Sequence, residues 1–206
     1  MDIYLSAAQE AIDRLGLLNS ESDETISKIL KNGHGLHPKK LSSDHRKSDP
    51  QLSKEEKRSL GLRSNAFMSQ SAFAEISQKG LIDAIKAHET TLLRASFTIF
   101  RWKSIQSIEE TKRIVGDCFA GVRFDANPDA CSFCQNLDGT LLENPLDALF
   151  PDKSCTCITA NYGISVKVDW LLGGSQKDNQ YSHDSRPMMR GIFQRIIDRL
   201  NFGRNS

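Results

Sequence analysis

Apolar residues recur every three or four positions through most of the first 119 residues, which is the spacing of amphipathic helices. The pattern predicts helices over residues 3–18, 22–32, 54–61, 69–79, 81–102 and 107–119. Two of these helices begin at capping boxes, in which Ser53 precedes Glu56 and Ser107 precedes Glu110. Gly16 and Gly80 are typical helix stops. The N-terminal part of the chain is therefore expected to be mainly helical.

Residues 33–53 lose this periodicity and are rich in polar side chains, so we interpret them as a solvated linker. The residues that could build a metal or hydrolytic site there are His34, His37, Asp44, His45 and Asp49. Their spacing matches no established motif. Basic residues outnumber acidic ones from Lys39 to Arg63 and could contact phosphates. A solvated surface is the preferred interpretation, because no aromatic residues are interleaved for base stacking.

His88 lies on the apolar face of the helix predicted over residues 81–102. Glu89 follows it, but the second histidine that a zinc protease helix requires is missing. We therefore interpret His88 as a hydrogen-bonded core or boundary residue, with a ligand role as the less favoured alternative.

The signals for β-strands cluster after residue 120. Val122–Phe124, Leu141–Leu142 and residues 158–168 carry the apolar or alternating pattern of strands, and Asp138-Gly139 is a turn signal between them. Beyond these strands, residues 173–180 have the composition of a flexible connector. Residues 188–202 predict a basic amphipathic helix, which we expect to dock on its own domain; a membrane, a nucleic acid and a partner groove are the alternatives.

The predicted fold class is α+β, a mainly helical N-terminal part packed on a small zinc-stapled β module, followed by a C-terminal amphipathic helix. The expected parts are N-terminal helices (1–32), a polar linker (33–53), a helical region (54–119), a zinc-binding β module (120–172), and a flexible connector with the C-terminal helix (173–206).

Four of the five cysteines form two close pairs, Cys131 with Cys134 and Cys155 with Cys157, separated by twenty residues. Two tight pairs of thiolates are typical of a structural zinc site, because zinc takes four sulfur ligands in a tetrahedron. If the second pair lies on a strand, its two side chains point the same way and can reach one ion. We therefore predict one structural zinc ion bound by these four cysteines.

Two alternatives remain open for the same residues. Two disulfides would fit an oxidising compartment, and four buried free thiols would fit a core without metal. The N-terminus shows no secretory signal, so we expect a cytoplasmic protein with reduced thiols. No apolar stretch reaches the length of a transmembrane helix, since Arg94 and Arg101 interrupt the longest candidate. The fifth cysteine, Cys118, lies in a helical pattern and is expected to be a small core residue.

Residues 120–139, together with Cys155-Thr156-Cys157, resemble the cysteine module of the phage Mu-type minor head (head morphogenesis) proteins. The shared pattern is a helix, a strand running into an acidic loop, Cys-x-x-Cys, Leu-Asp-Gly, a proline-bearing loop and Cys-x-Cys. The resemblance covers residues 107–160 and implies a phage or prophage protein with a portal or capsid partner and an association with the virion. The family usually has His-Pro where this chain has Asp152 and Lys153, and arginine where it has Thr156.

The composition and the cysteine pattern argue against two classes of function, nucleic-acid binding and catalysis. With 38% hydrophobic residues, 26% charged residues and a formal net charge of +1, the chain has no overall electrostatic attraction to nucleic acid. Four thiolates would also fill the coordination sphere of zinc and leave no place for a catalytic water. We therefore expect a non-catalytic, zinc-stabilised assembly or adaptor protein with a protein partner. The alternatives are a zinc-ribbon nucleic-acid-binding protein and a toxin or effector enzyme built on the same module.

Overall fold

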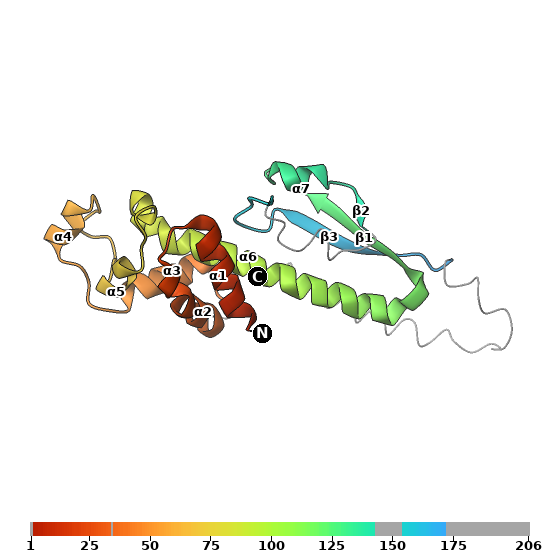
Figure 1. Cartoon of the computed structure of the whole chain (residues 1–206), viewed down its shortest axis with the longest axis horizontal. Helices are drawn as coiled ribbons and strands as arrows, with labels where there is room; N and C mark the ends of the chain where they lie inside the picture. The colour runs from red at the N-terminus through yellow and green to blue at the C-terminus, as the bar shows by residue number, and fades with distance from the viewer. Residues whose placement is uncertain (1, 34, 143–153, 172–206) are drawn as a thin grey trace. The chain divides into compact units, whose positions relative to one another are not determined.

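The computed structural model describes residues 2–33, 35–142 and 154–171 of the chain (Figure 1). It confirms the predicted α+β class, with a mainly helical N-terminal part and a small three-stranded antiparallel sheet. The chain divides into two units, residues 1–168 and 169–206. In the second unit only residues 169–171 are described, and the predicted connector and C-terminal helix lie outside the described residues.

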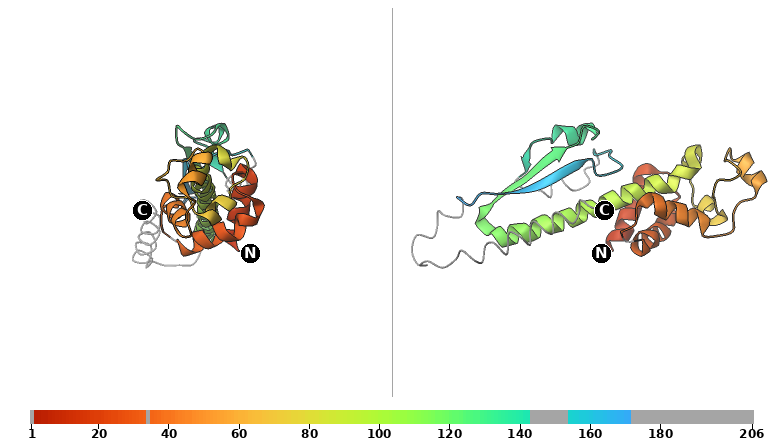
Figure 2. Two further views of the ribbon diagram at one scale, coloured as in Figure 1. Left: turned by 90° about the vertical axis from the view of Figure 1, so that its left-hand side faces the viewer. Right: turned by 180° about the vertical axis from the view of Figure 1, so that it is seen from behind.

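Six helices form the N-terminal part: α1 Ile3–Leu15, α2 Asp23–Asn32, α3 Pro38–Lys47, α4 Lys54–Ser59, α5 Gln70–Ala74 and α6 Ala84–Val115. Short 3-10 turns lie at Ser20–Ser22, Gly80–Asp83 and Gly116–Cys118. Helices α1, α2 and α3 pack around the first half of α6 (Figures 1 and 2). Ala7, Ala8 and Ala11 of α1 are fully buried in the core that α1 shares with α6, and such small side chains allow helices to pack closely.

Helix α6 contributes to two hydrophobic cores. Its first half, including Leu92 and Ala95, belongs to the core of the helical part. Phe97, Ile105 and Ile108 belong to a second core under the sheet, which also contains the cysteine pairs. The one helix therefore connects the helical part to the sheet. Neither α6 nor any other helix among the residues that the structure describes is long and apolar enough to cross a membrane.

The sheet consists of β1 Phe119–Ala126, β2 Leu141–Leu142 and β3 Tyr162–Val168, with β1 in the centre. All pairings are antiparallel, and Val122 of β1 lies opposite both Leu142 and Val166. A short helix, α7 Ser132–Asn136, lies in the connection from β1 to β2. The three predicted strands are confirmed, although the third begins at Tyr162 and not at residue 158. The expected turn at Asp138-Gly139 is also present, since Gly139 has a left-handed φ of 70°.

The prediction of a solvated linker over residues 33–53 is wrong. Helix α3 occupies Pro38–Lys47, with proline in its first turn and His37 accepting a hydrogen bond from the N–H of Lys39. Leu41 is buried, and so is Arg46, whose Nη1 donates to Ile85 O at 2.8 Å. Helix α3 looked like part of a linker because it has no apolar stripe, and its burial depends on one leucine, on Ser42 and on one hydrogen-bonded arginine.

Two predicted helix boundaries also change. The chain carries no glycine or proline between residues 84 and 115, so α6 runs past the expected new start at Ser107, with Ile105 and Ile108 both buried. The helix expected over residues 69–79 ends at Ala74, because the next backbone groups pair elsewhere. Ser77 N donates to Leu17 O, and Leu18 forms an antiparallel bridge with Ile76.

The capping box of α4 offers a local test of the first-turn contacts. Ser53 Oγ accepts from the N–H of Glu56, while the Glu56 carboxylate accepts from the N–H of Ser53. Ser53→Ala should destabilise this helix by about 1 kcal/mol, because it leaves one first-turn N–H without its acceptor. Amide hydrogen exchange of Lys57 and Leu60 should therefore become faster. Ser53→Asp, which keeps an acceptor, should leave the exchange rates unchanged, and equal acceleration in both variants would contradict the capping role.

Candidate metal centre

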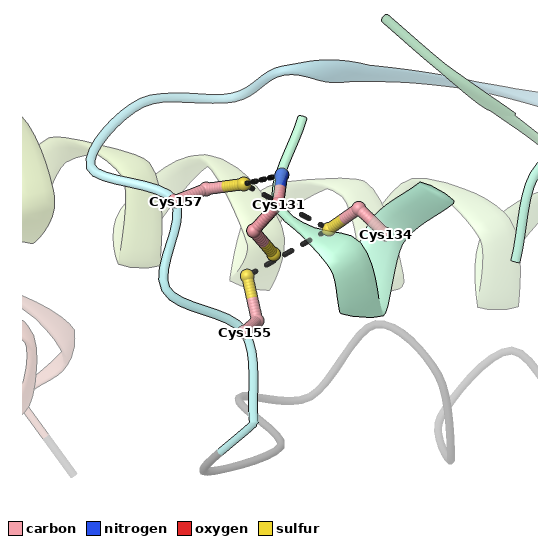
Figure 3. Close-up of side chains that lie close together, drawn as sticks. All are labelled: Cys131, Cys134, Cys155 and Cys157. Atoms are coloured by element: carbon pink, nitrogen blue, oxygen red, sulfur yellow. Dashed lines mark hydrogen bonds between the residues drawn. The ribbon is translucent and has the colours of Figure 1, made fainter. Parts of the chain in front are cut away.

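The four predicted cysteines come together at one end of the sheet, with their sulfur atoms pointing toward one another (Figure 3). All four Sγ atoms lie within 4.8 Å of one another. Cys134 Sγ is 3.8 Å from Cys155 Sγ and 3.9 Å from Cys157 Sγ. Four sulfurs bonded to one tetrahedral zinc ion at about 2.3 Å would be about 3.8 Å apart. The cluster therefore has the dimensions of a tetrahedral thiolate site.

The first pair is positioned by α7. Cys131 is the residue before the helix and Cys134 lies in its single turn, so their side chains fall on the same side. Hydrogen bonds hold the connection between β1 and β2 on both sides of α7. Gln135 Nε2 donates to Asn127 O at 2.6 Å, and Asp138 Oδ1 accepts from the N–H of Ala126 at 2.7 Å. These bonds hold the Cys-x-x-Cys turn against the end of β1.

The second pair lies in an irregular segment before β3, so the expectation of a strand at Cys155 and Cys157 is wrong. Both sulfurs still reach Cys134, and both side chains are buried. The N–H of Cys131 donates to Cys157 Sγ at 3.4 Å, which links the two pairs directly. The segment has this shape because other groups hold its backbone.

Two arginines from the helical part hold that backbone. Arg14 of α1 donates to the carbonyl of Cys155, and Arg94 of α6 donates to the carbonyl of Cys157. Glu10 joins the two arginines. It accepts from Arg94 Nη2 at 2.6 Å, from Arg94 Nε at 3.3 Å and from Arg14 Nη1 at 3.4 Å. Thr98 Oγ1 also donates to Glu10, at 2.9 Å. The Cys-x-Cys segment is therefore anchored to α1 and α6 by a charged, hydrogen-bonded network.

The thiols differ in their electrostatics. Burial raises the pKa of the Cys131 thiol, but the backbone N–H groups of Cys134 and Thr156 donate to its sulfur and bring the pKa down to about 6. Burial, together with the neighbouring Cys155, raises the pKa of Cys134 far above its usual range. Burial likewise raises the pKa of Cys157. Without a cation the cluster therefore favours few ionised sulfurs, whereas a bound divalent ion stabilises all four as thiolates.

All five cysteines are described, and all are free, so the disulfide alternative finds no support in the structure. The separations of 3.8 and 3.9 Å are far longer than an S–S bond of about 2.05 Å. The expectation that Cys118 is a core residue is wrong, because its side chain is only half-buried at the end of a 3-10 turn.

A second group of potential ligands escaped the sequence analysis. His45, Glu75 and His88 come together from α3, the residue after α5, and α6. Their spacing follows no motif, so only the fold reveals them. His88 is buried and hydrogen-bonded, as predicted.

The metal or hydrolytic site that residues 33–53 could have built does not form among those of its residues that the structure describes. His37 caps α3, Asp44 pairs with Lys40 at 2.6 Å, and Asp49 accepts from Ser71. His34 lies outside the described residues. Of the described residues in this segment, His45 alone joins a cluster of potential ligands, and its partners there come from outside the segment.

No family model, curated protein or solved structure matches the chain. The resemblance of residues 107–160 to phage minor head proteins therefore stays a prediction from the sequence. Of the positions where the chain departs from that family, Asp152 and Lys153 lie outside the described residues. Thr156, in the place of the family's arginine, donates its backbone N–H to the sulfur of Cys131. This contact does not depend on the identity of the side chain.

Proposed function

We propose that the protein is a non-catalytic assembly or adaptor protein whose β module is held together by one structural zinc ion. The gathering of four cysteine sulfurs within 4.8 Å of one another carries this proposal. Zinc suits a set of four sulfur ligands in a tetrahedron, and four thiolates leave it no open position for a reacting water. The metal would therefore serve structure and not catalysis.

Zinc would complete a chain of contacts between the two parts of the first unit. It would bind α7 to the irregular segment before β3, and that segment is bound to Arg14 and Arg94 of the helical part. The two guanidinium groups also compensate part of the negative charge of a zinc ion with four thiolates. Outer contacts of this kind orient ligands and tune metal affinity. A rigid β module fixed to a helical body would suit a protein that presents a surface to a partner.

The assembly role rests on the resemblance of the cysteine module to phage minor head proteins, which implies a portal or capsid partner and a phage or prophage origin. Virion association and a cytoplasmic location before assembly belong to the same proposal. The near-neutral net charge of +1 favours a protein partner over nucleic acid.

Metal analysis tests the structural part of the proposal. The chain purified without added metal should contain zinc, and thiol titration of the native protein should find Cys118 as the only freely reactive cysteine. Cobalt substituted at the cysteine site should show sulfur-to-cobalt charge transfer for four thiolates. Oxidised cysteines, or four reactive thiols without metal, would overturn the zinc assignment.

Co-elution tests the assembly part. The zinc-loaded chain should co-elute from a sizing column with purified portal or major capsid protein of a Mu-type phage, and Cys134→Ser should abolish this. Co-elution with neither protein would reject the portal or capsid partner. Retention on heparin that declines steeply with salt would instead support the nucleic-acid alternative.

A further inference from the structure

The second cluster of potential ligands lies in the helical part of the protein and shares no residue with the cysteine site. Glu75 Oε2 is 2.9 Å from His45 Nε2 and 2.8 Å from His88 Nε2, so both imidazole rings point at a single carboxylate oxygen. All three ligand atoms lie within 4.8 Å of one another. The rings themselves lie close, with centroids 5.1 Å apart. Three separate segments of the chain therefore direct two nitrogens and one oxygen to one point.

This donor set has the composition of known metal sites. Two imidazoles and one carboxylate bind zinc in several enzymes and other first-row divalent ions in the facial arrangement. Bonds of about 2.0–2.2 Å place neighbouring ligands of a six-coordinate ion about 2.9 Å apart. The two nitrogen–oxygen separations, 2.9 and 2.8 Å, match that value. One ion could therefore take the place of the hydrogens in the two hydrogen bonds between the imidazoles and Glu75, with small movements of the side chains.

Burial adds to the argument. The His88 side chain has no exposed surface, while those of His45 and Glu75 keep 11% and 16% of theirs. An ion could therefore enter from the side of His45 and Glu75 and keep water in its remaining positions. His88 Nδ1 is buried and has no hydrogen-bond partner among the residues that the structure describes, so an ion at Nε2 would be bound without a second-shell acceptor for the Nδ1–H.

One neighbouring charge opposes a cation. Arg46 lies close enough to act on His88, but its Nη1 is already committed to Ser42 Oγ at 2.5 Å and to Ile85 O at 2.8 Å. Glu89 also acts on Arg46 and offsets part of its charge. The Glu75 carboxylate, in direct contact, remains the nearest charge to the ion position.

We propose that His45, Glu75 and His88 form a second metal site, which takes one divalent first-row ion of the zinc type and leaves coordination positions for water. The site would join α3 to α6 and to the segment after α5. It is independent of the cysteine site, and its presence or absence does not decide the zinc staple proposed above.

Cobalt titration of the metal-free, full-length chain distinguishes the two sites. The cysteine site should give sulfur-to-cobalt charge transfer, whereas the second equivalent should give only the weaker bands of nitrogen and oxygen ligands. Wild type should bind two equivalents. His45→Gln should bind the second equivalent more than about tenfold more weakly, since even second-shell changes cost about 10–100-fold in metal affinity. The charge-transfer band should stay unchanged.

His37→Asn is the matched control. It removes an exposed imidazole next to the same helix but keeps an acceptor for the cap of α3. This variant should bind two equivalents, as wild type does. If the only equivalent that wild type binds is the one that gives sulfur-to-cobalt charge transfer, the proposal is overturned, whatever the variants do. Undiminished binding of the second equivalent by a folded His45→Gln protein would also overturn it.

Discussion

Replacing Cys134 by serine is expected to abolish metal binding at the cysteine site and to lower the free energy of unfolding by more than about 3 kcal/mol. Structural zinc supplies roughly 10–16 kcal/mol in zinc-finger peptides, and this module has an additional apolar core that retains part of its stability. Cys134 is only 1% exposed and contacts two other sulfurs. A serine hydroxyl there would be a poor zinc ligand and would remain buried with few partners.

Amide hydrogen exchange would show which elements lose stability in this variant. In Cys134→Ser, and in wild type treated with a chelator, amides of β1 and β3 should exchange faster, while those of α1 and α2 change less. The reason is that the sheet and the cysteines share one core, whereas α1 and α2 belong to the other.

Cys118→Ser is the control for this prediction, because Cys118 lies outside the cluster and is half-buried. It should keep the metal and the stability of wild type. Equal metal content and equal stability in both serine variants would mean that the four sulfurs are a thiol cluster in a core, the alternative that the spacing alone left open.

The cysteine site could be predicted because its information is local. Each pair is defined by a spacing of two or three residues, and the chemistry of four sulfurs limits what they can bind. The contacts that hold the second pair are not local. Arg94 and Glu10 are 84 residues apart. Arg94 appeared in the sequence only as a polar interruption of an apolar helix, and the structure shows it to be among the most deeply buried side chains.

The same limit explains the error over residues 33–53. A helix that buries one leucine has almost no apolar periodicity, and contacts with distant residues hold it in place, since Arg46 donates to Ile85 of α6 and His45 contacts Glu75. The helices α1 and α2 were predicted well because their first-turn residues, their apolar faces and the glycines after them are local signals, and the tertiary packing buries the same apolar faces. Composition alone could not distinguish a mobile polar segment from a helix held by buried polar contacts.

Replacing Arg94 by methionine is expected to destabilise the protein by about 3–5 kcal/mol, the range found when one partner of a buried ion pair is removed. Methionine is long and unbranched, so it fills much of the same space. The change would leave the Glu10 carboxylate without its bidentate partner and the Cys157 carbonyl without its donor. Because Arg94 also contacts Cys155, metal affinity at the cysteine site should fall with stability.

The pH dependence of stability would identify the cause. In wild type, burial raises the pKa of Glu10, but the hydrogen bond and charge of Arg94 outweigh this effect and hold the pKa below its ordinary value of 4.5. Glu10 therefore stabilises the fold above its unfolded pKa, and this contribution is lost as the pH falls through the folded pKa. In Arg94→Met the burial effect dominates, so the sign reverses, and lowering the pH from 7 toward 5 should reduce the stability gap between variant and wild type.

A double-mutant cycle with Glu10→Gln completes the argument. If the loss comes from an unpaired carboxylate, Glu10→Gln should recover part of the stability of Arg94→Met, and the two changes should be non-additive by more than about 1 kcal/mol. Arg14→Met is the matched control, since its side chain is 21% exposed and its contact with Glu10 is longer, at 3.4 Å. It should cost less and couple more weakly to Glu10. Additive effects at Glu10 and Arg94 would show instead that the stability loss comes from the Cys157 carbonyl and the space left by the guanidinium, with the ion pair contributing little.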